Sequence, residues 1–140
     1  MDGVKYLTID HVIGFHEEAL QMYGGLDGIR SEHELAAAVM QPQQSAFGED
    51  AYSTIPEKAA AYGYFIAQAQ AFVEGNKRTG AVAMETFLLL NYYEFHQDDD
   101  DIAQMFEDIG KVVDGKHVVD QAGFFGWVCN HAKPTAPAKA

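Results

Sequence analysis

Helix-start signals recur along this 140-residue chain and restrict its fold more than any other feature. Thr8 and Thr54 each stand directly before segments with apolar residues at helical spacing, where a hydroxyl can accept from the free amides of a first turn. Ser31 and Glu34 have the spacing of a capping box, and Pro56 lies where a first turn loses no hydrogen bond to proline. These signals predict helices over 9–23, 34–40 and 55–70.

Three more segments with helical spacing follow, over 79–95, 102–113 and 118–132. The segment 79–95 is the most apolar, so we expect it at the centre of the bundle. The sequence therefore predicts an all-α fold, a compact bundle of about six helices without a sheet. We expect one domain over 1–132, since a chain of this length suits a single core, and a disordered tail over 133–140 from its composition.

Charge, cysteine count and the length of the apolar runs argue against several classes of protein. The formal net charge is −12, from 9 Lys and Arg against 21 Asp and Glu, which opposes direct binding to nucleic-acid phosphates. A single cysteine, Cys129, excludes a disulfide within the chain and a zinc site with paired cysteines. The N-terminus lacks the pattern of a signal peptide, and the longest apolar run, 87–90, is too short to span a membrane. We expect a cytoplasmic protein with no membrane partner.

The stretch QAFVEGNKRTG, residues 70–80, concentrates the polar residues that chemistry would use. Gly75 precedes a helix whose first amides lack internal partners and carry partial positive charge, which suits an anion such as phosphate. Lys77 and Arg78 stand at the unfavourable end of that helix unless an anion binds there. Glu74 could hold a divalent metal that bridges the same phosphates. An ordinary turn with solvated charges remains the alternative, and the P-loop pattern is absent.

The motif around this stretch resembles the Fic/Doc family. The family signature runs histidine, any residue, Phe, any residue, an acid or Asn, Gly or Ala, Asn, Gly or Lys, and Arg. Seven contiguous positions, from Phe72 to Arg78, fit it. The segments KYLTIDHVIGFHE, YGGLDGIR and SEHELAAAVMQPQ and the spaced motif from Tyr52 to Tyr62 are similar to the death-on-curing, or Doc-like, branch. The resemblance extends over about 4–130.

The resemblance implies a helical bundle whose loop holds the triphosphate tail of ATP at the start of a central helix. It implies that Glu74 is the acid associated with Mg²⁺ and that Arg78 contacts phosphate. It also implies an anion-binding hole shaped by the neighbouring residues, with the Asn76 side chain contributing. The phosphate-binding set is then Gly75, Asn76, Lys77, Arg78 and Thr79.

Two departures point to the Doc-like branch. Lys77 replaces the glycine that is usual in AMP-transferring members, and Ala81 replaces their second arginine. For the Doc-like branch the resemblance implies a toxin that transfers a phosphoryl group to a translation elongation factor. It also implies a small antitoxin as the inhibitory partner.

The family's catalytic histidine falls on Gln70, and its usual proline on Ala71. Glutamine cannot take a proton from an attacking hydroxyl, and general-base assistance is typically worth about 10²–10⁴-fold. The paired change at Ala71 favours natural divergence over an engineered substitution. The histidines are remote in sequence and are interpreted as structural, although one could reach Gln70 in space: His11, His16, His33, His96, His117 and His131.

Three hypotheses therefore stand. The first is a phosphoryl or nucleotidyl transferase that is slow or uses a substitute base. The second is a pseudoenzyme that still binds nucleotide through the segment from Glu74 to Arg78. The third is an interaction module that binds a peptide or an antitoxin segment.

Overall fold

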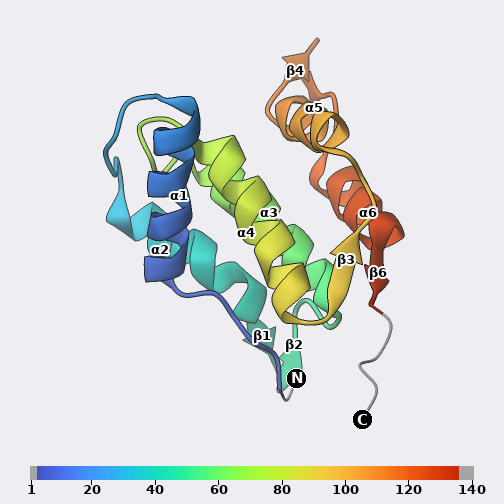
Figure 1. The fold of residues 1–140 in the computed structure, drawn as a ribbon. Helices are drawn as coiled ribbons and strands as arrows, with labels where there is room; N and C mark the ends of the chain where they lie inside the picture. Colours follow the sequence, from blue (N-terminus) through green and yellow to red (C-terminus); the bar gives the residue numbers. More distant parts are fainter. Residues whose placement is uncertain (1–2, 136–140) are drawn as a thin grey trace.

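The computed structural model describes residues 3–135, in which helices carry the fold (Figure 1). Six α-helices run in the order α1 (Ile9–Tyr23), α2 (Glu32–Met40), α3 (Ile55–Ala69), α4 (Asn76–Leu90), α5 (Asp99–Ile109) and α6 (Gln121–His131). Figure 1 shows α3 and α4 in the middle, with α1 and α2 on one side and α5 and α6 on the other. The predicted compact helical bundle is confirmed. None of the described helices is both long and apolar enough to cross a bilayer.

Side-chain caps start five of these helices. The hydroxyls of Thr8, Ser31 and Thr54 accept from the backbone N–H three residues later, at 3.2, 3.1 and 3.2 Å. Asp98 and Asp120 do the same with a carboxylate oxygen, both at 2.8 Å. The predicted caps at Thr8, Ser31 and Thr54 are therefore confirmed. The last helix was predicted from 118 but begins at Gln121, after the cap at Asp120. Among the described α-helices, only α4 begins without a side-chain cap.

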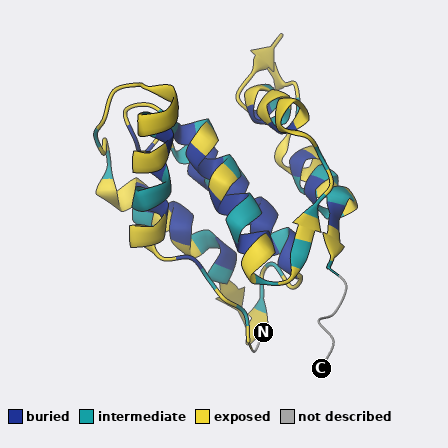
Figure 2. Cartoon of the chain, in the orientation of Figure 1, coloured by how far each residue is buried: buried dark blue, intermediate teal, exposed yellow. Residues whose placement is uncertain are grey.

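The core centres on α3 and α4, whose facing residues are buried along most of their length (Figure 2). The two helices cross closely at glycines. A Cβ added at Gly80 would lie 2.8 Å from the carbonyl oxygen of Gly63, a distance that side chains do not adopt. The close approach needs glycine at position 80, and it sets where the start of α4 lies relative to the end of α3.

Two glycine substitutions should have opposite effects. Gly80→Ala is expected to lower the free energy of unfolding by about 1–3 kcal/mol, because the added methyl meets the backbone of α3. Gly126→Ala in α6, where a Cβ would meet nothing within 4 Å, is expected to raise it by about 0.5–1 kcal/mol. Urea unfolding of both variants measures the difference. Equal effects at the two sites would contradict this account of the helix crossing.

The expectation of no sheet is wrong, because short antiparallel pairs connect the helices. The pairs are β1 (Ser45–Ala46) with β2 (Glu49–Asp50), β3 (Tyr93–Phe95) with β6 (Ala132–Pro134), and β4 (Val112–Val113) with β5 (Lys116–His117). A 3₁₀ turn, η1 (Gln41–Gln43), follows α2. Adjacent residues with positive φ form two of the hairpin turns, namely Phe47 with Gly48 and Asp114 with Gly115.

The helix predicted over 79–95 ends earlier, at Leu90. The side chain of Asn91 donates to the carbonyls of Phe87 and Lys5, at 2.9 and 3.0 Å, and so ties the N-terminal segment to the end of α4. Tyr92 then adopts a φ of 65°, which turns the chain into β3. A polar contact 86 residues away in sequence therefore accompanies the helix end that apolar periodicity overlooked.

The expected tail begins as part of the fold. Lys133 and Pro134 pair with Glu94 and Tyr93, and the N–H of residue 135 donates to the carbonyl of Tyr92 at 2.9 Å. The tail that was expected to be disordered from 133 is therefore hydrogen-bonded over its first three residues. Residues 136–140 lie outside the described part of the chain.

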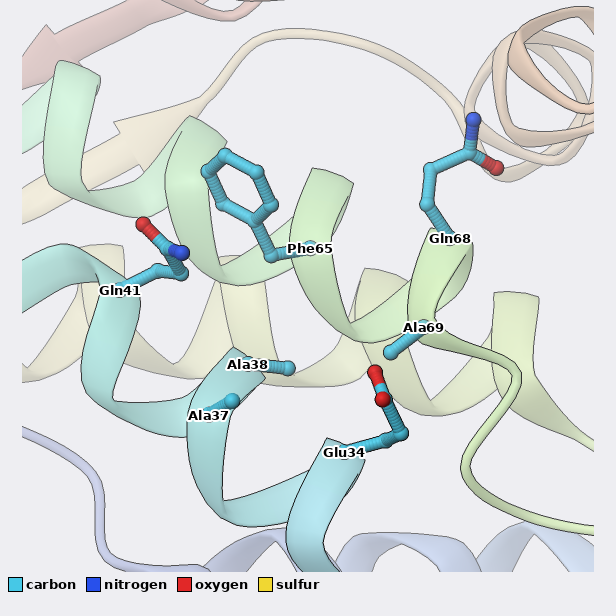
Figure 3. Close-up of a pocket in the computed structure, with 7 residues that line it drawn as sticks. All are labelled: Glu34, Ala37, Ala38, Gln41, Phe65, Gln68 and Ala69. Atoms are coloured by element: carbon cyan, nitrogen blue, oxygen red, sulfur yellow. The ribbon is translucent and has the colours of Figure 1, made fainter. Parts of the chain in front are cut away.

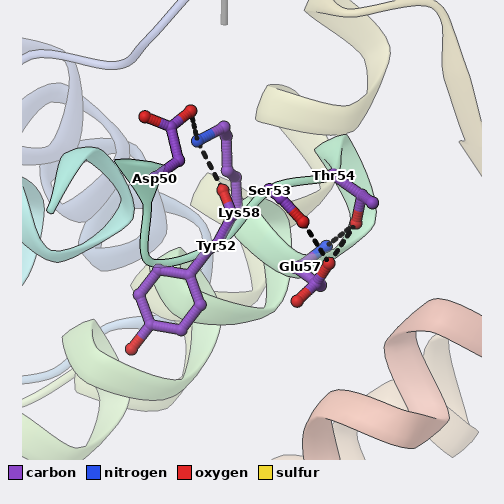
Figure 4. A network of polar contacts seen from close by, with 6 residues as sticks. All are labelled: Asp50, Tyr52, Ser53, Thr54, Glu57 and Lys58. Atoms are coloured by element: carbon purple, nitrogen blue, oxygen red, sulfur yellow. Dashed lines mark hydrogen bonds and ion pairs between the residues drawn. The ribbon is translucent and has the colours of Figure 1, made fainter. Parts of the chain in front are cut away.

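A buried lysine anchors the segment between β2 and α3 (Figure 4). The Nζ of Lys58, which is 0% exposed, donates to the carbonyl of Tyr52 at 2.6 Å and to the carboxylate of Asp50 at 3.1 Å. It also lies 5.5 Å from the centre of the Tyr6 ring. The hydrogen bond from Lys58 is the main reason that the pKa of Asp50 lies below its ordinary value.

Candidate anion-binding site at the start of α4

The start of α4 leaves several backbone amides without a partner. Gly75 stands before the helix with a φ of 83° and has no side chain that could cap it. In the part of the chain that the structure describes, the backbone N–H groups from Gly75 to Arg78 have no hydrogen-bond acceptor, and Thr79 makes the first helical bond, to Gly75. Such amides carry the positive end of the helix dipole. An uncapped helix start of this kind can bind an anion such as phosphate.

Asn76 holds the loop before the helix in a closed ring. Its Oδ1 accepts from the N–H of Phe72 and its Nδ2 donates to the carbonyl of Phe72, both at 3.0 Å. The side chain is buried, and both of its polar atoms bond to the loop backbone. Asn76 can serve the hole through its backbone N–H and by fixing the shape of the loop.

The segment before α2 pairs with the same loop. The N–H of Val73 donates to the carbonyl of Gly28 at 3.0 Å. The carbonyl of Ala71 accepts from both Arg30 and Ser31, at 2.6 and 3.1 Å. These main-chain bonds attach the loop to the α1–α2 connection, so its position does not depend on α3 and α4 alone.

His16 of α1 lies against the loop. Its Nε2 is 2.8 Å from the carbonyl oxygen of Glu74, and its ring stacks on Phe72 with centroids 3.8 Å apart and planes inclined by 10°. From the sequence, His16 is interpreted as structural, and its contact with the loop is not predicted. The available signal was helical spacing, since His16 lies on the buried face of α1 with Val12 and Ala19.

Glu74 directly precedes Gly75 and presents one exposed carboxylate. Its Oε2 accepts from the N–H of Leu26 at 3.2 Å, and the side chain is otherwise exposed. No group of three or more His, Cys, Asp or Glu side chains that could hold a metal occurs within 3–135. A lone carboxylate fits Mg²⁺, which proteins commonly bind through one or two carboxylates while phosphates and water complete the shell. The residues present therefore fit a metal that arrives with a phosphate ligand.

Lys77 and Arg78 each contact a side chain of another helix. The Nζ of Lys77 lies 3.1 Å from the Glu107 carboxylate of α5, with both side chains partly exposed. The Arg78 guanidinium lies over the ring of Tyr23, 4.2 Å from its centre. An exposed ion pair of this kind contributes about 0–1 kcal/mol, so an anion could draw Lys77 away at little cost.

Thr79 differs from the expectation that it binds phosphate. Its side chain is 0% exposed, and its N–H already donates to Gly75 at 3.0 Å. No partner for its hydroxyl is found among the described residues. Thr79 therefore packs beneath the loop and is enclosed by protein on every side, away from a ligand that arrives from solvent.

Gln70 ends α3 in the left-handed conformation, with φ 54° and ψ 38°. Its Nε2 donates back to the carbonyl of Ala67 at 3.2 Å, and its side chain is exposed. None of the hydrogen bonds made by histidines within the described range reaches Gln70. A substitute base for Gln70 is therefore absent from its hydrogen-bond partners in this part of the chain.

A pocket of about 210 Å³ lies between α2 and α3 (Figure 3). It is lined by Glu34, Ala37, Ala38, Gln41, Phe65, Gln68 and Ala69. The pocket shares no residue with the loop at 70–80, although Ala69 directly precedes Gln70. It is thus a neighbour of the loop and a separate feature of the surface.

Two comparisons with known proteins bear on this site. The sequence model of the Fic/DOC family matches residues 6–88, which is more than half of the chain. The chain is 41% identical over 78 residues to the toxin Doc of Mycolicibacterium smegmatis, across 56% of this chain. The chain spans 60% of the length of that curated relative.

Proposed function

The chain belongs to the Fic/DOC family, and on that premise we propose that it is a Doc-like toxin that transfers a group from ATP to a protein hydroxyl. The group is a phosphoryl group or, in the AMP-transferring manner, a nucleotidyl group. The observation that carries the proposal is the uncapped start of α4, which stands beside one carboxylate and two cations. Phosphoryl transfer depends mainly on positioning and charge stabilisation, which these groups can supply.

The open amides from Gly75 to Arg78 would bind the phosphate oxygens. Arg78 would add paired hydrogen bonds through its guanidinium, and Lys77 a mobile positive charge. Both cations are held by exposed contacts that are easily exchanged, with Glu107 and Tyr23. The chain can therefore concentrate positive charge at one point while its net charge stays at −12.

Glu74 would hold Mg²⁺ with the oxygen that does not accept from Leu26. When bound, the ion supplies neutralisation of phosphate charge. The hydrogen bond from Nε2 of His16 to the carbonyl oxygen of Glu74 holds the backbone of Glu74, and its exposed carboxylate would remain free to meet an incoming nucleotide.

Gln70 takes the position that we assign to the family histidine. Its Nε2 is engaged by Ala67, so its Oε1 is the atom that can accept a hydrogen bond from a target hydroxyl. That bond orients the hydroxyl without removing its proton. We therefore propose a slow transferase, with the shortfall confined to proton transfer.

We propose a translation elongation factor as the target, a small antitoxin as the partner, and the cytoplasm as the place of action. The similarity to a protein named as the toxin Doc supports the toxin-type part of this assignment and, with it, an antitoxin partner. The alternative is a catalytically inactive pseudoenzyme or a peptide-binding module. The pocket between α2 and α3 favours the peptide-binding module, because it could hold a peptide side chain close to Ala69, which directly precedes Gln70.

Calorimetry with ATP and Mg²⁺ tests the nucleotide site. Arg78→Ala is expected to weaken binding by about 10–100-fold, because hydrogen bonds to a charged group contribute about 1.5–3 kcal/mol. Arg30→Ala is the matched control, since Arg30 is also exposed and only its backbone contacts the loop. Equal affinities for the parent protein and both variants would overturn the nucleotide-binding proposal.

A further inference from the structure

We propose that His16 is a positioning residue that sets the direction of the first amide of the anion site. The proposal rests on the proposed function, since it concerns the same loop. It assigns to α1, which carries none of the motif residues, the control of how the loop presents Gly75. Three observations on the imidazole support this positioning role.

The first contact is the hydrogen bond between Nε2 of His16 and the carbonyl oxygen of Glu74, at 2.8 Å. A carbonyl oxygen only accepts, so Nε2 carries the hydrogen. The peptide unit that joins Glu74 to Gly75 is planar and trans, so its N–H points opposite to its carbonyl. By holding the Glu74 oxygen, His16 therefore aims the Gly75 N–H away from α1 and into the group of open amides.

The second contact is the stack on Phe72, with ring centroids 3.8 Å apart and planes inclined by 10°. Both rings are buried, His16 at 2% and Phe72 at 0% exposure. Phe72 is also the residue that Asn76 clasps through two hydrogen bonds. The imidazole therefore packs on the residue whose backbone is hydrogen-bonded to the first residue of α4.

The third observation concerns the space beside Gly75. A Cβ at Gly75 would lie 3.3 Å from Cδ2 of His16, so the imidazole occupies the space beside the glycine. The ring thus contacts the Phe72 side chain and the Glu74 carbonyl oxygen, and it fills the space beside Gly75. This arrangement leaves the Glu74–Gly75 peptide little room to rotate.

The same helix also supports the second phosphate ligand. Tyr23 follows His16 by two helical turns and lies beneath the guanidinium of Arg78, 4.2 Å from ring centre to carbon. One face of α1 therefore meets the motif at its amide end and at its arginine. Helix α1 would therefore position both the amide of Gly75 and the guanidinium of Arg78, the two groups proposed to bind the anion.

Two substitutions separate the roles of the imidazole. His16→Gln keeps an N–H donor near the Nε2 position and loses the aromatic stack, whereas His16→Phe keeps the stack and loses the donor. We expect His16→Phe to move the backbone amide resonance of Gly75 in ligand-free protein and to weaken ATP–Mg²⁺ binding by about tenfold. We expect His16→Gln to stay within about threefold of the parent affinity, even if it unfolds at a lower temperature.

The outcomes decide the two proposals separately. If the parent protein fails to bind ATP, the proposed function falls, while the Gly75 resonance of the ligand-free variants still decides the role of His16. An unmoved Gly75 resonance in His16→Phe would overturn the positioning role. So would a loss of affinity that follows thermal stability in both variants, because that pattern indicates general packing.

Discussion

Gln70→His is expected to raise the rate of group transfer from ATP to a protein target by about 10²–10⁴-fold. The added imidazole can accept the proton that an attacking hydroxyl must lose, which an amide cannot do at neutral pH. The remaining parts that we assign to catalysis, the open amides with Glu74 and Arg78, are already in place. The gain should therefore appear in the rate, with little change in ATP affinity.

The backbone at position 70 accepts this change. Gln70 has a positive φ of 54°, and histidine is among the residues found more often than most in that region. The side chain is exposed and makes one hydrogen bond, to Ala67, so the fold should be unaffected. Incubation of each protein with ATP labelled in the γ- or α-phosphate and a cell lysate measures transfer and identifies the group transferred.

Two controls isolate the position of the base. Gln68→His places an imidazole two residues earlier, at the pocket between α2 and α3, and should give no gain. Adding Arg78→Ala to Gln70→His should remove the gain, because the phosphate ligand is lost. If Gln70→His binds ATP and labels nothing, the transferase proposal is contradicted and the nucleotide-binding pseudoenzyme takes its place.

Lys58→Ala is expected to lower the free energy of unfolding by about 3 kcal/mol. The substitution empties the space of a side chain that is 0% exposed and leaves the Tyr52 carbonyl without its donor at 2.6 Å. Thermal unfolding followed by circular dichroism should show a midpoint lower by about 10 °C. Lys116→Ala, at an exposed lysine of β5, is the matched control and should change the midpoint little.

Acid adds a second readout for the same lysine. The pKa of Asp50 is lowered in the folded protein, chiefly by the hydrogen bond from Lys58. The resulting stabilisation is present above the unfolded-state pKa of Asp50 and is lost as the pH falls through its folded-state value. Lys58→Ala should therefore flatten the loss of stability in acid. An unchanged acid profile and melting midpoint would contradict the role of Lys58 as an anchor.

The predictable part of the fold depends on local chemistry. Thr8, Ser31 and Thr54 start helices because each hydroxyl meets an amide only three residues away, a relation that can be read from the sequence. The end of α4 depends on Asn91 contacting Lys5, and β3 depends on a strand almost forty residues later. Periodicity contains no signal for such distant pairs, so the helix was predicted too long.

The candidate site divides in the same way. The loop from Glu74 to Arg78 was predicted because its residues are contiguous. His16 and Tyr23 were missed because they reach the loop from another helix. The inward turn of Asn76 was also missed, because its partner is the backbone of Phe72, and sequence letters do not record main-chain geometry.

The two hydrogen bonds between the Asn76 side chain and the Phe72 backbone hold the loop in one shape in the absence of a ligand. Ordering a flexible backbone costs about 1–2 kcal/mol for each residue. The loop is already ordered in the folded protein, so ligand binding would not add this cost. An anion that bound at the proposed site would therefore lose little affinity to ordering of the loop, and its rate of binding would depend on diffusion and charge. At the proposed site the loop would then act as a preformed receptor for the anion.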